Sequence, residues 1–182
     1  MTQKVYELNP VKAITAHAVG EPGHRVFYIQ ARTPDEIVTL IAEKEQVVIL
    51  ARGVYQFLKE IDEKFPAEME DAPVGPLDLE LRGPFEPNFR VATLGLGYDA
   101  ENDRVVLVAE ELTPEDADSE PSAAASVARF WATRSQMRAM ADRALEVAAR
   151  GRPQCPLCGR PEDPDGHFCP RRNGHSRTLL TT

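Results

Sequence analysis

The sequence predicts an α+β protein made of a duplicated unit, four strands followed by one long helix, with antiparallel sheets and a C-terminal zinc knuckle. Three observations predict this class. Short alternating apolar segments are separated by turn residues, two longer segments carry apolar residues every three or four positions, and a cysteine cluster lies near the end. At 182 residues, 42% of them hydrophobic and 27% charged, the chain has the composition of a globular protein.

The first unit, residues 1–65, contains four segments with the alternation or the branched and aromatic content of strands. These segments are Val5–Leu8, Lys12–Val19, Arg25–Ala31 and Glu36–Ala42. The apolar period then becomes three to four residues, which predicts an amphipathic helix from Glu45 to Phe65. Pro66 ends this helix, and we interpret the acidic, proline-rich residues 66–76 as a linker.

The second unit, residues 77–150, repeats this order. Its predicted strands are Leu77–Leu81, Phe89–Leu96, Arg104–Val108 and Val127–Trp131, with a solvated acidic loop at 110–124. Thr133 and Gln136 form a capping box that opens a second helix, and Gly151 ends it. The buried stripe of this helix is expected to comprise Met137, Met140, Ala141, Ala144, Leu145 and Ala148.

Short matches between the two units support a duplication. Arg25-Val26 corresponds to Arg104-Val105, and the helix start Glu43–Gln46 corresponds to Thr133–Gln136. Each unit alone would leave a sheet face and a helix stripe uncovered, so we expect the two to pack about a pseudo-twofold axis as one body. Residues 151–182 are then a zinc-binding tail attached to the second helix.

The tail carries the most specific pattern in the chain. Cys155 and Cys158 lie in Cys-Pro-Leu-Cys-Gly, and Cys169 follows a second predicted turn. With one histidine these thiols make a Cys3His set, the usual ligand count of a closed, structural zinc site. Either His167, two residues before Cys169, or His175, six residues after it, can reach the site, and we favour His167 because its neighbour Gly166 supplies the turn that delivers it.

The expected compartment is the cytoplasm. The N-terminus has no apolar leader, no segment approaches the length of a membrane span, and three cysteines cannot all pair as disulfides. We therefore expect reduced thiols that bind metal, and no membrane partner.

The charge distribution suggests a partner. Residues 1–128 carry eleven basic and 24 acidic side chains, whereas residues 129–182 carry ten arginines and five acids. The leading hypothesis is a non-enzymatic interaction protein whose tail docks an acidic protein partner through Arg150, Arg152, Arg171 and Arg172. The alternative for this basic end is that it pairs with the acidic body of its own fold.

Two other functions remain open. A single-stranded nucleic-acid binder would use Arg129, Phe130, Trp131 and Arg134, although the two aromatic residues face opposite sides of one strand. A phosphate-handling enzyme would use Lys44 and Arg134, which stand at the two helix starts, as an anion site between the repeats. The sequence has no glycine-rich phosphate loop, and neither His17 nor His24 has a serine or cysteine nearby in the sequence, which favours a protein without catalysis.

Several motifs resemble an uncharacterised actinobacterial family, domain of unknown function 3090. They are Val19–Tyr28 (Val-Gly-Glu-Pro-Gly-His-Arg-Val-Phe-Tyr), Glu43–Val47, Phe89–Val91 and, most specifically, the tail from Ala149 to Arg171 with both cysteine turns. The resemblance covers the whole chain. The resemblance implies that His167 is the zinc ligand, and it gives no indication of an activity. The duplicated architecture is also similar to single-strand nucleic-acid binding proteins of the purine-rich-element and whirly type, but the acidic or neutral strands of this chain depart from that pattern.

Overall fold

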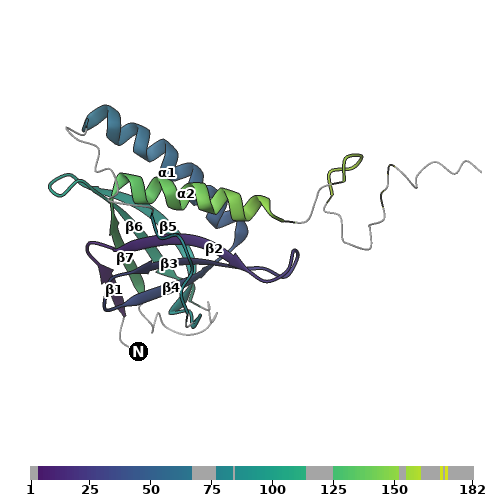
Figure 1. The fold of residues 1–182 in the computed structure, drawn as a ribbon, viewed down its shortest axis with the longest axis horizontal. Helices are drawn as coiled ribbons and strands as arrows, with labels where there is room; N and C mark the ends of the chain where they lie inside the picture. Colours follow the sequence, from purple (N-terminus) through teal and green to yellow (C-terminus); the bar gives the residue numbers. More distant parts are fainter. Residues whose placement is uncertain are drawn as a thin grey trace, which may run out of the picture.

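The computed structural model describes residues 4–66, 77–83, 85–113, 125–151, 155–160, 169 and 171. Figure 1 shows the strands and helices that these residues form. The strands are β1 (Val5–Leu8), β2 (Ala13–Val19), β3 (Val26–Arg32), β4 (Ile37–Ala42), β5 (Phe89–Asp99), β6 (Arg104–Glu111) and β7 (Val127–Ala132), and the helices are α1 (Lys44–Lys64) and α2 (Arg134–Ala149). Most of the predicted linker and of the predicted acidic loop, residues 67–76 and 114–124, lies outside the described residues.

All seven strands belong to one sheet, in the order β1-β7-β6-β5-β4-β3-β2. Strands β2, β3 and β4 form one antiparallel run, and β5, β6 and β7 form another. Two parallel pairs join the runs, with Leu40 of β4 beside Phe89 of β5 and Leu8 of β1 beside Phe130 of β7. The α+β class is confirmed. The expected antiparallel pairing holds within each run, and the two parallel pairs depart from it: β5 lies beside β4, and β1, which precedes β2 in the chain, lies beside β7.

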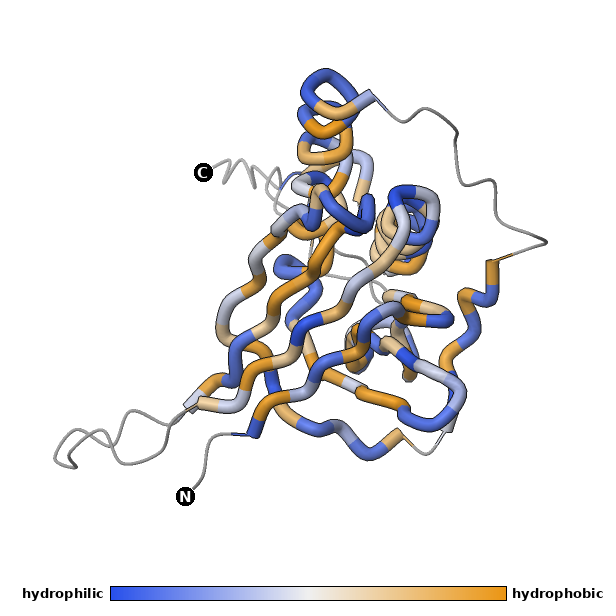
Figure 2. The backbone as a smooth tube through the Cα atoms, turned by 90° about the vertical axis from the view of Figure 1, so that its left-hand side faces the viewer, coloured by the Kyte–Doolittle hydropathy of each residue, from blue (hydrophilic) through white to orange (hydrophobic). Residues whose placement is uncertain are grey.

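The connection from β1 to β2 closes the sheet. The Val11 N–H donates to the carbonyl of Trp131 in β7 at 2.8 Å, and the Lys12 N–H donates to the carbonyl of Arg32 in β3, also at 2.8 Å. These two residues therefore bond to opposite ends of the strand order, and the sheet curls into a barrel (Figures 1 and 2).

Alternation along the strands fills this barrel with apolar side chains. Figure 2 shows hydrophobic and hydrophilic residues following one another along the strands. Phe130 is fully buried in the core, whereas its neighbour Trp131 is half-buried on the other face of β7, as the sequence predicts. The largest fully buried core side chains include Leu8, Ile14, Ile29, Leu40, Leu107 and Phe130.

Helices α1 and α2 lie side by side against the barrel (Figure 1). Their bounds agree with the sequence prediction to within one residue, and the predicted stripe of α2 is buried except for Leu145, which is half-buried while Val147 is buried. Neither helix in the described part of the chain has both the length and the apolar composition that a membrane crossing requires.

A glutamine at the start of each helix makes the same set of bonds. The Gln46 Oε1 atom accepts the Glu43 N–H at 2.8 Å, and its Nε2 donates to the Ala92 carbonyl at 3.1 Å. The Gln136 Oε1 atom accepts the Thr133 N–H at 2.9 Å, and its Nε2 donates to the Lys12 carbonyl at 3.1 Å. Each glutamine thus closes the capping box of its own helix and ties that helix to the start of the other run of strands.

Residues 77–83 correct the sequence prediction. Leu77–Leu81 is not a strand; this segment crosses the face of β2 and β3 that points away from the core. The Thr15 hydroxyl donates to the Leu79 carbonyl at 2.7 Å, and the Gln30 amide exchanges two hydrogen bonds with the backbone of Arg82, at 2.8 and 2.9 Å. The segment alternates like a strand, but side chains of β2 and β3 form hydrogen bonds to its backbone, and no strand among the described residues pairs with it. In the described residues the second unit therefore contributes three strands instead of four.

Candidate metal centre

Three cysteine side chains converge after α2. The Sγ atoms of Cys155, Cys158 and Cys169 all lie within 4.8 Å of one another, and those of Cys155 and Cys169 are 3.9 Å apart. Tetrahedral zinc with Zn–S bonds of about 2.3 Å requires sulfur–sulfur distances of about 3.8 Å. The cluster therefore fits a thiolate-bound metal ion. The described cysteines are free thiols, with Cys155 and Cys169 buried.

A tight turn brings the first two sulfurs together. The Gly159 N–H donates to the Cys155 carbonyl and the Cys155 N–H donates to the Arg160 carbonyl, both at 2.8 Å. Gly159 has a φ of +71°, which side chains with a Cβ rarely adopt, so glycine is the residue that closes this turn at little cost. The Cys-x-x-Cys-Gly spacing therefore does locally what the sequence predicts: it turns both thiols to one side.

Backbone amides stabilise negative charge on the first thiol. Hydrogen bonds from the backbone of Cys158 and then Leu157 lower the pKa of the Cys155 thiol. At Cys158 the backbone of Arg160 lowers the pKa of the thiol, but desolvation and the neighbouring sulfurs of Cys155 and Cys169 raise it by more. Ionisation of the Cys155 thiol is thus favoured, whereas ionisation of the Cys158 thiol beside it is disfavoured unless a cation is present. A bound metal ion supplies that cation.

The described residues supply three ligands of the predicted four. His167 and the alternative His175 lie outside the described residues, so the choice between them stays a prediction. Among the described histidines, cysteines and acids, the group that could hold a metal contains no residue besides these cysteines. Three thiol ligands do not suit magnesium or calcium, which bind oxygen.

Two of the four predicted partner-binding arginines can be placed. Arg150 caps the C-terminus of α2, is exposed, and forms an ion pair with Glu146 one turn earlier. The Arg150 carbonyl accepts a hydrogen bond from the Arg25 guanidinium, which also donates to the Val147 carbonyl at 3.0 Å. Arg171 is exposed two residues after Cys169. Arg152 and Arg172 lie outside the described residues.

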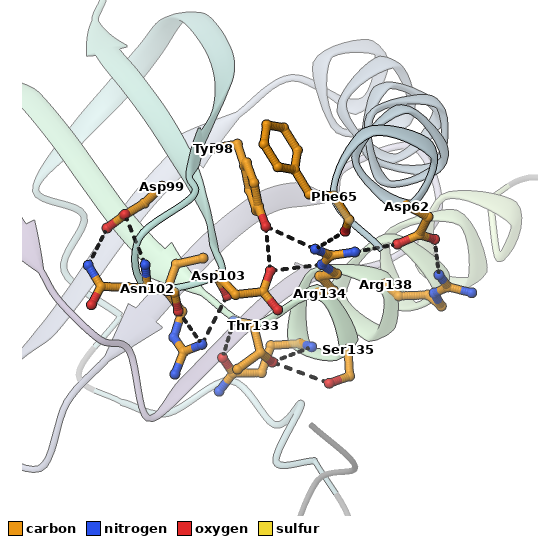
Figure 3. A network of polar contacts seen from close by, with 12 residues as sticks. Asp62, Phe65, Tyr98, Asp99, Asn102, Asp103, Thr133, Arg134, Ser135 and Arg138 are labelled. Carbon is orange, nitrogen blue, oxygen red and sulfur yellow. Dashed lines mark hydrogen bonds and ion pairs between the residues drawn. The ribbon is translucent and has the colours of Figure 1, made fainter. Parts of the chain in front are cut away.

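The predicted anion-binding residue Arg134 is already neutralised (Figure 3). Its guanidinium donates to Asp62 at 2.7 Å, to Asp103 at 2.8 Å, to the Phe65 carbonyl at 2.8 Å and to the Tyr98 hydroxyl at 2.9 Å. Its side chain is only 14% exposed. This network joins the start of α2 to the end of α1 and to the turn between β5 and β6, which is a structural role.

The electrostatics of this network agree with that role. Burial raises the pKa of Asp103, but hydrogen bonds from Tyr98 and Arg134 lower it by more, so the carboxylate is held ionised. Burial lowers the pKa of Arg134, and the bonds to Asp103 and Asp62 raise it by more. Desolvation, the largest effect at Tyr98, raises the pKa of that phenol. The ion pair with two carboxylates leaves no net positive charge for a phosphate.

The structure does not bring Lys44 and Arg134 together. Arg134 at the start of α2 contacts Asp62 near the end of α1, whereas Lys44 at the start of α1 is exposed beside Gly151, just past α2. The helices are therefore antiparallel, and α1, at 21 residues, spans about 30 Å. One anion site cannot use both residues.

A cavity of about 720 Å³ between residues 77–80 and α2 also gives no phosphate site. Its charged lining consists of Asp78, Glu80, Asp142 and Glu146 against one cation, Arg143.

The Arg143 side chain also contacts His17, with Arg143 Nη2 lying 2.7 Å from His17 Nε2. The two residues are far apart in the sequence, so the local sequence pattern could not indicate this contact. Since a guanidinium can only donate, His17 Nε2 is the acceptor of this contact.

The fold and the cluster define an α+β barrel protein, one seven-stranded sheet with two covering helices, that carries a C-terminal three-cysteine site suited to a metal ion. The chain belongs to the family described as protein of unknown function (DUF3090), whose family model matches residues 6–169. This match includes the barrel, both helices and all three cysteines. No curated protein and no solved structure matches the chain.

Proposed function

We propose that the protein is a zinc-stabilised, non-enzymatic binding protein whose C-terminal segment docks an acidic protein partner. The observation that carries the proposal is the convergence of the Cys155, Cys158 and Cys169 sulfurs to within 4.8 Å. With His167 as a fourth ligand the coordination shell would be closed, leaving no position for water or substrate, so the metal would be structural. Free thiols that bind metal persist in a reducing compartment, which supports a cytoplasmic location.

The docking surface would consist of the arginines that flank the metal loop. Arg150 and Arg171 are exposed, and Arg152 and Arg172 adjoin them in the sequence. The metal would fix the loop from Cys155 to Arg160, so that these guanidinium groups meet a carboxylate surface with little loss of conformational entropy. Because Arg150 already pairs with Glu146, the partner must compete with that carboxylate.

The test is capture on immobilised poly-glutamate and from native lysate. Replacing Arg150, Arg152, Arg171 and Arg172 by alanine should abolish capture on both while leaving the melting temperature unchanged. The matched control replaces four basic residues of the body, Lys12, Lys59, Lys64 and Arg82, by alanine and should retain capture. Chelation should weaken capture by the native chain. Unchanged capture by the four-arginine variant would reject the proposal.

A single-stranded nucleic-acid binder is the second candidate, and one observation favours it. Trp131 and Arg129 lie on the face of β7 that points away from the core, where a base could stack on the indole. Arg129 is paired with Glu7 at 2.8 Å, which places this candidate second. A mobility-shift titration at low salt with Trp131→Ala as the comparison tests it; no shift by the native chain removes it.

We also infer that the barrel arose by duplication of a unit of three strands and a helix. The support is the matched order β2-β3-β4-α1 and β5-β6-β7-α2, together with the corresponding bonds of Gln46 and Gln136. Each unit would then complete the other, because each glutamine binds the first strand of the opposite unit. Separate expression of residues 1–66 and 77–151 tests this: the halves should fold only when mixed.

A further inference from the structure

A groove of about 290 Å³ runs between α1 and β5. Its walls are largely apolar, with Ile49 and Leu50 from α1 and Leu94 and Leu96 from β5. Two glycines, Gly53 on the helix and Gly95 on the strand, also line it. The volume is enough for one large aliphatic side chain from another molecule.

The two glycines are not required by the fold of the single chain. Neither Gly53 nor Gly95 has a positive φ. A Cβ on Gly95 would meet no atom within 4 Å, and one on Gly53 would first meet Leu96 Cδ1 at 3.9 Å. Glycine inside a helix or strand costs about 0.5–1 kcal/mol relative to alanine. The chain therefore keeps a recess at some cost in its own stability.

The matching place on the other side of the barrel has a different chemistry. Counting along each helix from the glutamines that make corresponding bonds, Gly53 of α1 matches Arg143 of α2. Arg143 extends to His17 at 2.7 Å. The cavity beside Arg143 is therefore lined mainly by charged side chains and bounded by residues 77–80, whereas the groove between α1 and β5 is largely apolar.

A protruding side chain stands at the edge of the groove. Ile49 is 68% exposed, and its match on α2 is the small residue Ala139. Glu45 lies one turn before it and Arg52 one turn after it, both exposed and on the same stripe of α1. Neither forms an ion pair with another residue of the described part of the chain. One surface thus carries a recess, a protrusion and two opposite charges.

We propose that a second copy of this chain docks here, as a homodimer with a two-fold axis beside Ile49. Such an axis sets the two α1 helices antiparallel and places Glu45 of each copy opposite Arg52 of the other, so one pairing occurs twice. It also places each Ile49 over the groove of the other copy, beside the Leu50 that lines it. A self-complementary surface needs a protrusion and a recess on the same face, and this stripe of α1 carries both.

Sedimentation velocity and light scattering over a concentration series, on the full metal-loaded chain, test the proposal. The native chain should be a dimer. Ile49→Asp should raise the dissociation constant at least ~100-fold by placing a charge in the apolar contact. Arg52→Glu should raise it about tenfold, and the double variant E45R/R52E should restore it to within about threefold of the native value.

Val5→Asp is the matched control, because Val5 is 47% exposed and lies on β1, which β7 and β6 separate from β5. This variant should remain a dimer, and circular dichroism should report the native fold for every variant. A native chain that is monomeric at ~100 µM overturns the proposal. So does a dimer that Ile49→Asp leaves intact, or a double variant E45R/R52E that does not restore the dissociation constant. A monomer that octanoate stabilises against heat, with loss of that effect in Gly53→Leu, would assign the groove to an acyl chain instead.

Discussion

Removing the Arg134 guanidinium should destabilise the barrel more than removing any well-exposed arginine. The substitution is Arg134→Met, which keeps most of the side-chain volume but removes the guanidinium that donates to Asp62, Asp103 and the Phe65 carbonyl; the Tyr98 hydroxyl still donates to Asp103. Breaking a fully buried pair costs about 3–5 kcal/mol. Asp62 and Asp103 are 50% and 41% exposed, and water can rehydrate them, so we expect about 2–3 kcal/mol.

Urea denaturation and calorimetry measure this loss. In a chain of this size each kcal/mol lowers the melting temperature by about 2–4 °C, so Arg134→Met should lower it by about 4–12 °C. Arg138→Met is the control: Arg138 is 55% exposed and 3.8 Å from Asp62, and its loss should cost less than about 0.5 kcal/mol. Equal, small losses in the two variants would refute the structural role assigned to Arg134.

Three further predictions concern the barrel. Phe130→Ala should cost about 3–5 kcal/mol in urea denaturation, since Phe130 is fully buried; a loss below 1 kcal/mol would contradict its place in the core. Gln46→Ala and Gln136→Ala should each cost about 1–2 kcal/mol and agree within about 0.5 kcal/mol, because the two amides make corresponding bonds; unequal losses would argue against equivalent halves. The pKa of Asp103 is lowered by folding, so its contribution is fully present above its unfolded pKa of about 3.9 and is lost as the pH falls through the folded pKa. A denaturation series should therefore lose stability below about pH 4 in the native chain, and less steeply in Arg134→Met.

The local features of the fold could be predicted because they depend on neighbours in the sequence. Alternation placed Phe130 and Trp131 on opposite faces of one strand, and the spacing of Thr133 and Gln136 located the start of α2. The Cys155 and Cys158 turn was equally local. In each case a few consecutive residues contain all the chemistry that decides the structure.

The features that sequence reasoning missed depend on long-range pairing. Alternation states which face of a strand is buried but not which strand lies beside it, so the parallel pair of β1 with β7 could not be read from Val5–Leu8. Leu77–Leu81 alternates like a strand because its leucines are half-buried and its other residues exposed, whereas Thr15 and Gln30 hold its backbone.

The partners of charged residues were missed for the same reason. Arg134 stands at a helix start, where a free cation could attract an anion, but the fold brings Asp62 and Asp103 to it from two other elements. Nothing near Arg134 in the sequence indicates this neutralisation. The residue types predict what a side chain can do, and the tertiary contacts decide whether it is free to do it.

Metal content is the most direct test of a thiolate-held C-terminal segment. Elemental analysis of the full chain, purified without added metal, should find about one zinc per polypeptide. Cys155→Ser, Cys158→Ser and Cys169→Ser should each lose it, and His167→Ala should lose it where His175→Ala does not. A native chain without bound metal, or equal metal in the native chain and in a variant lacking all three cysteines, would contradict the account.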